Sequence, residues 1–339
     1  MNNFRFLTSG ESHGKCLTAI IDGIPAGFDI DIDFINSELA RRQKGCGRGE
    51  RMNIESDTAE ITSGVRFGKT IGSPVTIVVK NKDWENWQTV MSVSKDDYTQ
   101  EKSFTKCRPG HADYAGSIKY NHKDLRNVLE RSSARKTAAE VAVGAIAKQI
   151  LKKYGVTCES KILQIGKSSD NFNSETDRVK ALGDTTGGKF EVVYNNLPVG
   201  LGSYVQWDKA LDGRIAQAVM SIPAVKAVEI GENPISFLGS EYHDEMYINN
   251  GEVIRKTNNA GGIEGGMTNG APLVVKAVMK PIPTLKKPLN TIDLKDMTEC
   301  KAHFERSDTC AVEACSVVAE SRIAWILVDE ILSGISYVE

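Results

Sequence analysis

Two long segments that are apolar around most of their circumference constrain the fold of this chain more than any other feature. The first, Thr137–Lys153, has helical spacing and is followed by Gly155, a residue suited to the position just past a helix end. The second, Cys310–Leu332, has the same character. A helix that is apolar on nearly all sides must be enclosed by other elements. The sequence therefore predicts at least two helices buried in a core.

Short runs rich in valine and isoleucine predict the strands that enclose these helices. They are bounded by Gly, Pro or Asn and span Leu17–Asp22, Pro74–Lys80, Phe190–Tyr194 and Pro272–Met279. A more polar helix is predicted over Asp31–Arg42, because it begins with acidic residues and ends with arginine. The fold class is therefore α+β or layered α/β.

Composition excludes several classes of protein. The 339 residues are 40% hydrophobic and 25% charged, as in folded globular proteins. The net charge of −2 gives no global attraction to nucleic acid or to an acidic membrane. The chain has no apolar run of membrane-spanning length. Its start lacks a basic stretch followed by a long apolar run, so we expect no secretory signal. Seven scattered cysteines without a CxxC pair predict reduced thiols, and we expect a cytoplasmic location.

Three short signatures occur twice in the same order, which suggests an internal duplication. Gly23-Ile-Pro-Ala-Gly27 is repeated as Asn196-Leu-Pro-Val-Gly200, Gly68–Pro74 as Gly266–Pro272, and Arg131-Ser-Ser133 as Arg306-Ser-Asp308. Short Gly/Pro matches also arise by chance, so the sequence leaves the hypothesis open. If it holds, the halves are related by a pseudo-two-fold axis and the two buried helix starts face each other.

Two histidines lie in turn-rich loops. His13 stands between two glycines, and His111 follows a Pro-Gly turn. Histidine titrates near neutral pH, so both are candidates for proton transfer. Each could equally be a plain loop histidine. His111 precedes Asp113 by two residues, but without a third ligand at a familiar spacing this pair does not predict a metal site.

Cations gather in loops next to the predicted helices. The stretch from Arg41 to Arg51 combines five cations with three glycines, which favours an anion-binding loop over a solvated basic surface. The segment Arg131–Thr137 adds hydroxyls and cations where free N–H groups attract anions. Asp308 precedes the last helix, where it could take part in chemistry or simply be an N-cap.

A set of segments together resembles the chorismate synthase family in order and spacing. These are GESHG at 10–14, RRQ and GRG at 41–49, RPGHADY at 108–114, RSSAR at 131–135, NAGGIEGG at 259–266, KPIPT at 280–284 and RSDTC at 306–310. The resemblance extends from about Phe6 to Leu332. The chain departs from the family's usual GRSSARET at Glu130 and Lys136, and its RSDTCAVEAC differs from the RHDPC that many members have.

The resemblance implies a carbon–oxygen lyase of the shikimate pathway that acts on phosphates. Its substrate would be 5-enolpyruvylshikimate 3-phosphate, and a 1,4-anti elimination of phosphate and a ring proton would give chorismate, at the last common step of aromatic amino-acid biosynthesis. The family requires reduced FMN without net redox change, and NAD(P)H would serve only to reduce the flavin. Two phosphorylated ligands agree with several cationic loops.

The resemblance also implies roles for single residues. His13 is expected to protonate the leaving phosphate, His111 to lie near flavin N1, and Asp308 to lie near flavin N5 and assist removal of the C6 proton. The substrate-binding arginines would be Arg41, Arg42, Arg48, Arg108 and Arg135. The cofactor contacts would be Arg131, Ser132, Ser133, Pro223, Ala224, Gly265, Lys280, Pro281, Ile282, Pro283, Thr284 and Arg306.

For the fold, the resemblance implies a β-α-β sandwich with long helices between antiparallel sheets, as one domain over residues 1–339. It implies a homotetramer that binds a small-molecule substrate and neither nucleic acid nor a membrane. The two buried helices agree with this architecture.

Two other classes of function are weighed against this one. A flavin-dependent oxidoreductase would need a nicotinamide site, and the chain has no G-x-G-x-x-G fingerprint. A non-catalytic anion-binding protein would not need two loop histidines together with Asp308. Both alternatives are therefore less favoured than the lyase.

Overall fold

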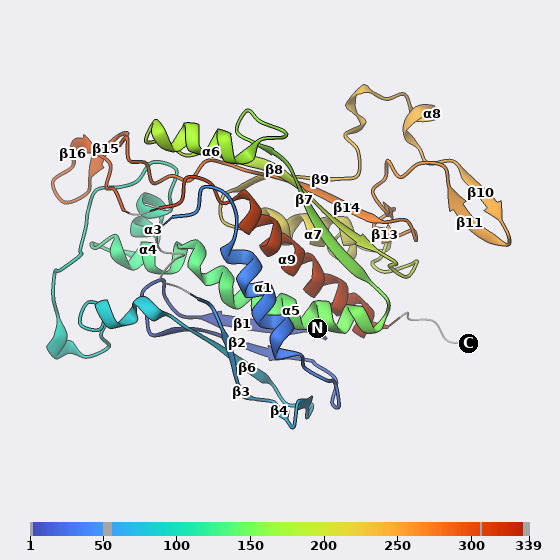
Figure 1. Ribbon diagram of the computed structural model, residues 1–339, viewed down its shortest axis with the longest axis horizontal. Coiled ribbons are helices and arrows are strands. Elements are labelled where there is room, and N and C mark those ends of the chain that lie inside the picture. Colours follow the sequence, from blue (N-terminus) through green and yellow to red (C-terminus); the bar gives the residue numbers. More distant parts are fainter. Residues whose placement is uncertain (1–2, 50–55, 306, 335–339) are drawn as a thin grey trace.

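Two four-stranded antiparallel sheets enclose a layer of helices (Figure 1). The structure, a computed structural model, describes residues 3–49, 56–305 and 307–334. The first sheet has the order β1-β2-β6-β3, with β1 (Arg5–Ser9), β2 (Cys16–Asp22), β3 (Ala59–Ser63) and β6 (Val75–Lys80). The second has the order β7-β8-β14-β9, with β7 (Thr157–Ile165), β8 (Gly188–Asn195), β9 (Val225–Ile230) and β14 (Leu273–Met279).

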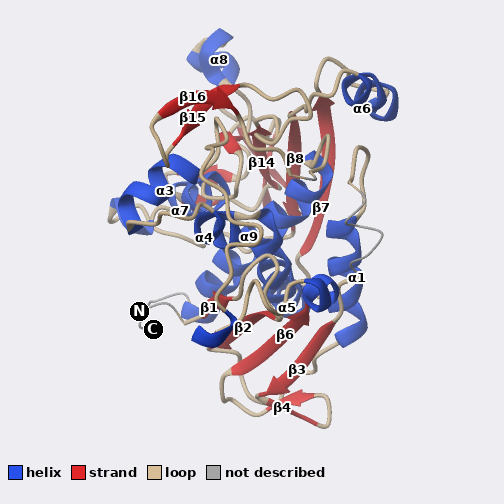
Figure 2. Cartoon of the chain, turned by 90° about the vertical axis from the view of Figure 1, so that its left-hand side faces the viewer, coloured by secondary structure: helices blue, strands red, loops and turns tan. Residues whose placement is uncertain are grey.

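The helical layer contains the two long apolar segments. Helix α5 (Thr137–Lys153) packs on the first sheet, helix α9 (Val312–Ser333) packs on the second, and the two helices pack against each other. Helix α1 (Ile32–Gln43) lies beside α5, and α7 (Leu211–Met220) lies beside α9. Figure 2 shows the sheets at opposite ends of the molecule with these helices between them. The predicted β-α-β sandwich is thus confirmed.

Side-chain periodicity explains why the layers form. Along β6 and β14 every second residue is buried, as expected of strands with one face on a core. One continuous cluster of buried apolar side chains includes both inner sheet faces and both long helices. Gly155 has a φ of +76° just past α5, as the sequence predicts.

The chain also forms shorter helices and two-stranded hairpins. The remaining helices are α3 (Asp113–Tyr120), α4 (Arg126–Ser132), α6 (Phe172–Ala181) and α8 (Gly239–Tyr242). The two-stranded hairpins pair β4 (Val65–Arg66) with β5 (Lys69–Thr70), β10 (Met246–Asn249) with β11 (Glu252–Arg255), β12 (Ile263–Glu264) with β13 (Met267–Thr268), and β15 (Asn290–Asp293) with β16 (Thr298–Lys301). Within the described ranges, no helix is long and apolar enough to cross a membrane.

The two halves of the chain repeat one topology. If the added hairpins and short helices are set aside, each half runs β-β-α-β-β-α, and in each sheet the strands lie in the order first, second, fourth, third. A register shift interrupts the pairing of the third and fourth strands in both sheets. Both long helices begin at the same end of the molecule (Figure 1).

Equivalent threonines close equivalent loops in the two halves. Thr70 Oγ1 donates to the Pro25 carbonyl at 2.6 Å, and Thr268 Oγ1 donates to the Pro198 carbonyl at 2.6 Å. The Thr70 carbonyl accepts from Gly27 N–H at 2.8 Å, as the Thr268 carbonyl does from the glycine of the second loop at 2.9 Å. These shared bonds, in the motifs that the sequence repeats, support the duplication.

Candidate active site

His13 lies in the tight loop between β1 and β2, where a buried glutamate holds it. The loop turns at Gly10, whose φ is +100° and where an added Cβ would lie 2.3 Å from the Cys16 carbonyl oxygen. His13 Nδ1 lies 2.7 Å from Glu130 Oε1, and its backbone N–H donates to Glu130 Oε2 at 2.8 Å. Both residues are more than nine-tenths buried. The carboxylate therefore fixes both the backbone and the ring of His13.

An aromatic side chain covers the His13 ring. Trp87 stacks on it with 3.8 Å between ring centroids and 22° between planes. Trp87 Nε1 donates to Asp83 at 3.0 Å, and Lys102 Nζ lies 3.8 Å from the Trp87 ring. His13 is thus held by Glu130 at its ring edge and by Trp87 on its ring face, which are more contacts than a plain loop histidine needs.

His111 also has a carboxylate partner. Its Nδ1 lies 2.5 Å from Oδ1 of the fully buried Asp113, which begins α3. Arg108 binds the same carboxylate through Nε at 2.8 Å and Nη2 at 2.9 Å. Burial would raise the pKa of Asp113, but the hydrogen bonds from Arg108 and His111 lower it well below its usual value. Asp113 is thus held as an anion that orients His111.

The two histidine pairs adjoin at one aromatic ring. The ring of Phe104 lies 5.6 Å from the guanidinium of Arg108, which binds Asp113 beside His111. The same ring lies 5.1 Å from the guanidinium of Arg126, which lies beside Glu130. A chain of contacts through Phe104 therefore connects the surroundings of His13 and His111, which are far apart in sequence.

A buried arginine cluster lies next to the His13 loop. Asp57 accepts from Arg135 Nη1 at 2.6 and 2.7 Å and from Arg42 Nη2 at 3.0 Å. Arg135 Nε donates to Asn81, whose amide in turn donates to the carbonyl of Gly14 at 2.6 Å. Asn81 thus connects the cluster to the His13 loop.

The charge of this cluster is unusual for buried groups. Burial lowers the pKa of Arg42 to about 10, and nearby Arg135 and Arg48 add to the effect while Asp57 opposes it. Among the described residues, buried Arg42 Nε has no hydrogen-bond partner. Arg48 Nη1 donates to Asp308 Oδ2 at 2.6 Å. Arg42 and Arg135 share the carboxylate of Asp57, so the cluster suits an anionic ligand.

Arg41 is not brought to this cluster. Its guanidinium binds Glu320 at 2.8 and 2.9 Å and Glu38 at 2.7 Å, along the flank of α9. Adjacent residues of a helix point about 100° apart, which explains why Arg41 and Arg42 face different surroundings. The predicted substrate role of Arg41 thus lacks support from its position.

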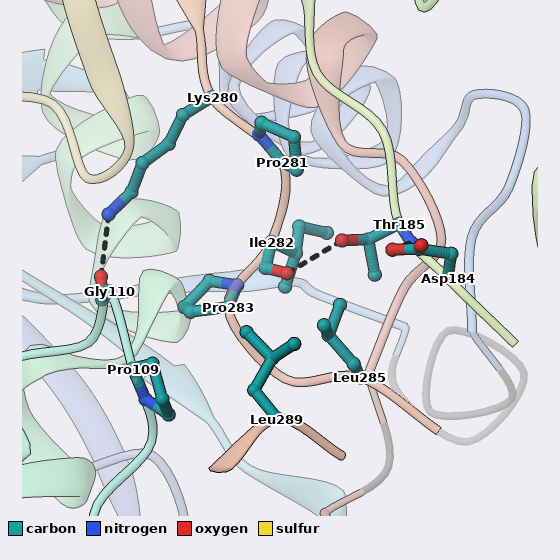
Figure 3. A pocket seen from close by; sticks show the side chains of 10 residues that line it. All are labelled: Pro109, Gly110, Asp184, Thr185, Lys280, Pro281, Ile282, Pro283, Leu285 and Leu289. Atoms are coloured by element: carbon teal, nitrogen blue, oxygen red, sulfur yellow. Dashed lines mark hydrogen bonds between the residues drawn. The ribbon is translucent and has the colours of Figure 1, made fainter. Parts of the chain in front are cut away.

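A cavity of about 410 Å³ lies beside the His111 loop (Figure 3). Pro109 and Gly110 form one wall, and the predicted segment Lys280–Pro283 forms another. Lys280 Nζ donates to the Gly110 carbonyl at 2.5 Å and so ties the two walls together. Most of the lining is apolar, as in sites that hold a flat ring.

Other predicted cofactor residues fall into three groups. Thr284 lies at the end of the cavity wall, 3.4 Å from Arg108 Nη1, and the Ala224 carbonyl, which follows Pro223, accepts from Lys280 N–H. Arg131, Ser132 and Ser133 follow directly after Glu130, where Arg131 donates to the backbone carbonyls of Thr8 and Gly10. Gly265 lies in the turn between β12 and β13, near the start of β14, whereas Lys280 follows the opposite end of β14. The structure therefore does not bring Gly265 to the cavity, and Arg306 lies outside the described residues.

One local interpretation of the helix starts is wrong. Asp308 is not an N-cap, because α9 begins at Val312 after Ala311, and its oxygens accept from Arg48 and from Gly49 N–H at 2.6 Å. Ser133 caps the short 3-10 turn Ala134–Lys136, which leads directly into α5. Among the residues that the structure describes, no three His, Cys, Asp or Glu side chains form a group that could hold a metal ion.

Sequence reasoning missed four residues that shape the site: Asp57, Trp87, Arg126 and Glu130. Glu130 stood out only as a departure from the family pattern, and the other three had no local signal.

Comparison with known proteins identifies the family of the chain. A family model described as chorismate synthase matches residues 4–332. The chain belongs to the chorismate synthase family. A chorismate synthase from Thermoanaerobacter pseudethanolicus is 53% identical, with 97% of this chain and 93% of that protein covered. One from Aquifex aeolicus is 48% identical, with 97% and 92% covered.

A solved structure gives the same result for the fold. A crystal structure of chorismate synthase matches with a TM-score of 0.77 and 40% identity, over 97% of this chain and 92% of that one. The chain is therefore an enzyme of the chorismate synthase family, a lyase of the shikimate pathway.

Proposed function

We propose that this enzyme converts 5-enolpyruvylshikimate 3-phosphate to chorismate and phosphate by 1,4-anti elimination, with reduced FMN as cofactor and no net redox change. The observation that carries the proposal is the position of His13, held by Glu130 beside a buried cluster in which Arg42 and Arg135 both bind Asp57. An acid next to an anion site is what the departure of phosphate requires.

The arginine cluster would hold the anionic groups of the substrate. Among the described residues, the buried donor Arg42 Nε finds no acceptor, and such groups are rare in folded proteins unless a ligand or water completes them. Arg48 and Arg135 lie close enough to Arg42 to influence its pKa, so one anion could reach several guanidiniums. Arg108 would contribute from the His111 side.

The cavity beside His111 fits the proposed cofactor. Its proline- and leucine-rich wall suits a flat ring, while Lys280, Thr185 and Asp184 supply the polar groups of the lining. The residues that would hold it are Lys280, Pro281, Ile282, Pro283 and Thr284, with Pro223 and Ala224 beside them, Arg131, Ser132 and Ser133 from the α4 end, and Arg306. Reduced FMN, when bound, supplies electron density as the phosphate leaves.

The remaining proton chemistry is assigned to three side chains. His13 would protonate the leaving phosphate. His111, oriented by Asp113, would place an N–H beside the cofactor and stabilise negative charge there. Asp308 would assist removal of the ring proton. Arg48, which donates to Asp308 at 2.6 Å, would also bind the substrate.

An anaerobic assay with reduced FMN and the phosphorylated substrate tests the proposal. Replacing His13 or His111 with alanine should lower turnover by about 10²–10⁴-fold. His243→Ala, at an exposed position outside the site, is the matched control and should keep full turnover. Near-normal turnover of both site variants would refute the roles, and NAD(P)H consumption without chorismate would indicate an oxidoreductase. We further expect a cytoplasmic homotetramer in which NAD(P)H serves only as flavin reductant.

A further inference from the structure

The contact between Glu130 and His13 has two points of attachment with different chemistry. Oε2 accepts from the backbone N–H of His13 at 2.8 Å, and Oε1 lies 2.7 Å from the ring Nδ1. The backbone group can only donate. An ionised carboxylate can only accept, so the ring proton that faces Glu130 sits on Nδ1. Nε2 is the nitrogen that Glu130 does not hold.

Arg126 lies beside Glu130 without competing for its hydrogen bonds. Arg126 Nη1 lies 3.6 Å from Glu130 Oε1, within ion-pair range, and makes no hydrogen bond with any described residue. The guanidinium lies 5.3 Å from the Trp87 ring and 5.1 Å from the Phe104 ring, and its Nε donates to the Lys102 carbonyl at 3.0 Å. Arg126 is therefore fixed in place, and Oε1 stays available to His13.

The other side of Arg126 offers a comparison built into the fold. Its Nη2 donates to Glu305 Oε1, and that oxygen lies 3.3 Å from His303 Nε2. His303 stacks on Phe104 at 4.3 Å, as His13 stacks on Trp87. One arginine thus serves two carboxylate–histidine pairs, and Asn81 connects the loop of the His13 pair to the arginine cluster. Glu305 is therefore a suitable control for Glu130.

We propose that Glu130 is the positioning residue of His13: it holds a proton on Nδ1 and thereby makes Nε2 the atom that exchanges a proton with the substrate. This inference rests on the proposed function. The imidazolium gives its Nε2 proton to the phosphate oxygen as the carbon–oxygen bond breaks. The ring then remains neutral, with its other proton on Nδ1 still donated to Glu130.

Glu130→Gln separates this role from a purely structural one. The glutamine side chain has one accepting oxygen and one donating NH2 group. Its oxygen must turn to the backbone N–H of His13, because a buried N–H without an acceptor is costly. The NH2 group then faces Nδ1 and forces the ring proton to Nε2. A protonated His13 ring would place its Nδ1–H against the NH2 group of the glutamine, so the imidazolium is disfavoured. The loop stays anchored while the tautomer reverses.

The tautomer can be observed by ¹⁵N NMR of the full chain labelled at histidine, with the His13 signals assigned by their loss in His13→Asn. We expect a proton on Nδ1 in the wild type and on Nε2 in Glu130→Gln. Turnover with reduced FMN should fall about 10²–10⁴-fold with KM within about threefold, since proton transfer and not binding is affected. Glu305→Gln should change neither the His13 tautomer nor turnover.

Glu130→Asp gives a second variant if Glu130→Gln does not fold. It keeps the acceptor-only chemistry, so the proton should stay on Nδ1, and more activity should remain than in Glu130→Gln. An unchanged tautomer in Glu130→Gln, or a reversed tautomer with full turnover, would overturn the inference. Wild-type protein that forms no chorismate would instead refute the proposed function, whatever the tautomer.

Discussion

Replacing Gly144 with alanine tests how closely the two buried helices cross. A Cβ added at Gly144 in α5 would lie 2.2 Å from the Cβ of Ser321 in α9 and 2.6 Å from its Cα. Side-chain rotation cannot relieve either contact, because neither atom moves with χ1. Overpacking a core costs about 1–3 kcal/mol, with rigid overlaps at the upper end. Alanine recovers about 1 kcal/mol of helix propensity, so we expect a net loss of about 2 kcal/mol.

Urea unfolding followed by circular dichroism measures this change. The matched control is Gly213→Ala in α7, where the only heavy atom within 4 Å of the added Cβ is the Trp207 carbonyl oxygen at 3.8 Å. That variant should gain about 0.5–1 kcal/mol. Adding Ser321→Gly to Gly144→Ala removes the Cβ contact and should restore part of the loss. A Gly144→Ala protein at least as stable as the wild type would refute the close crossing.

The arginine cluster, the duplicated loops and the buried ion pairs each give a further test. Arg42→Ala should raise the substrate KM by about 10–100-fold in steady-state kinetics, whereas Arg41→Ala should leave it unchanged, because only Arg42 joins the anion cluster. Thr70→Val and Thr268→Val should lose similar free energies of unfolding, each about 1–3 kcal/mol, and clearly unequal losses would contradict their equivalence. Burial would raise the pKa of Glu320, but Lys148 and Arg41 lower it to about 2. The ion pairs of Glu320 therefore stabilise the fold above about pH 4.5, and this stabilisation is lost as the pH falls towards 2. Stability measured over that range should depend less on pH in Glu320→Gln.

The architecture could largely be predicted from local patterns. The apolar circumference of Thr137–Lys153 dictates a buried helix, and the valine-rich runs dictate the strands around it. These two features are encoded within a few residues of each other, where propensity and periodicity operate. The repeated Gly/Pro signatures suggested the duplication, and the equivalent threonine bonds of the two halves support it.

The partners inside the site could not be predicted in this way. Glu130 lies 117 positions from His13, and Arg135 lies 78 positions from Asp57. Nothing in a single segment specifies which distant carboxylate will meet which cation, because tertiary packing decides it. The adjacency of Arg41 and Arg42 in sequence was equally uninformative, since the helix turns them to different surroundings.

A single turnover under anaerobic conditions tests the central claim most directly. Excess full-length protein with reduced FMN is mixed with 5-enolpyruvylshikimate 3-phosphate, while phosphate, chorismate and the flavin spectrum are followed together. We predict one phosphate and one chorismate for each substrate consumed, and a flavin that ends the turnover reduced. Phosphate released without chorismate, or flavin oxidised in proportion to substrate, would contradict the account.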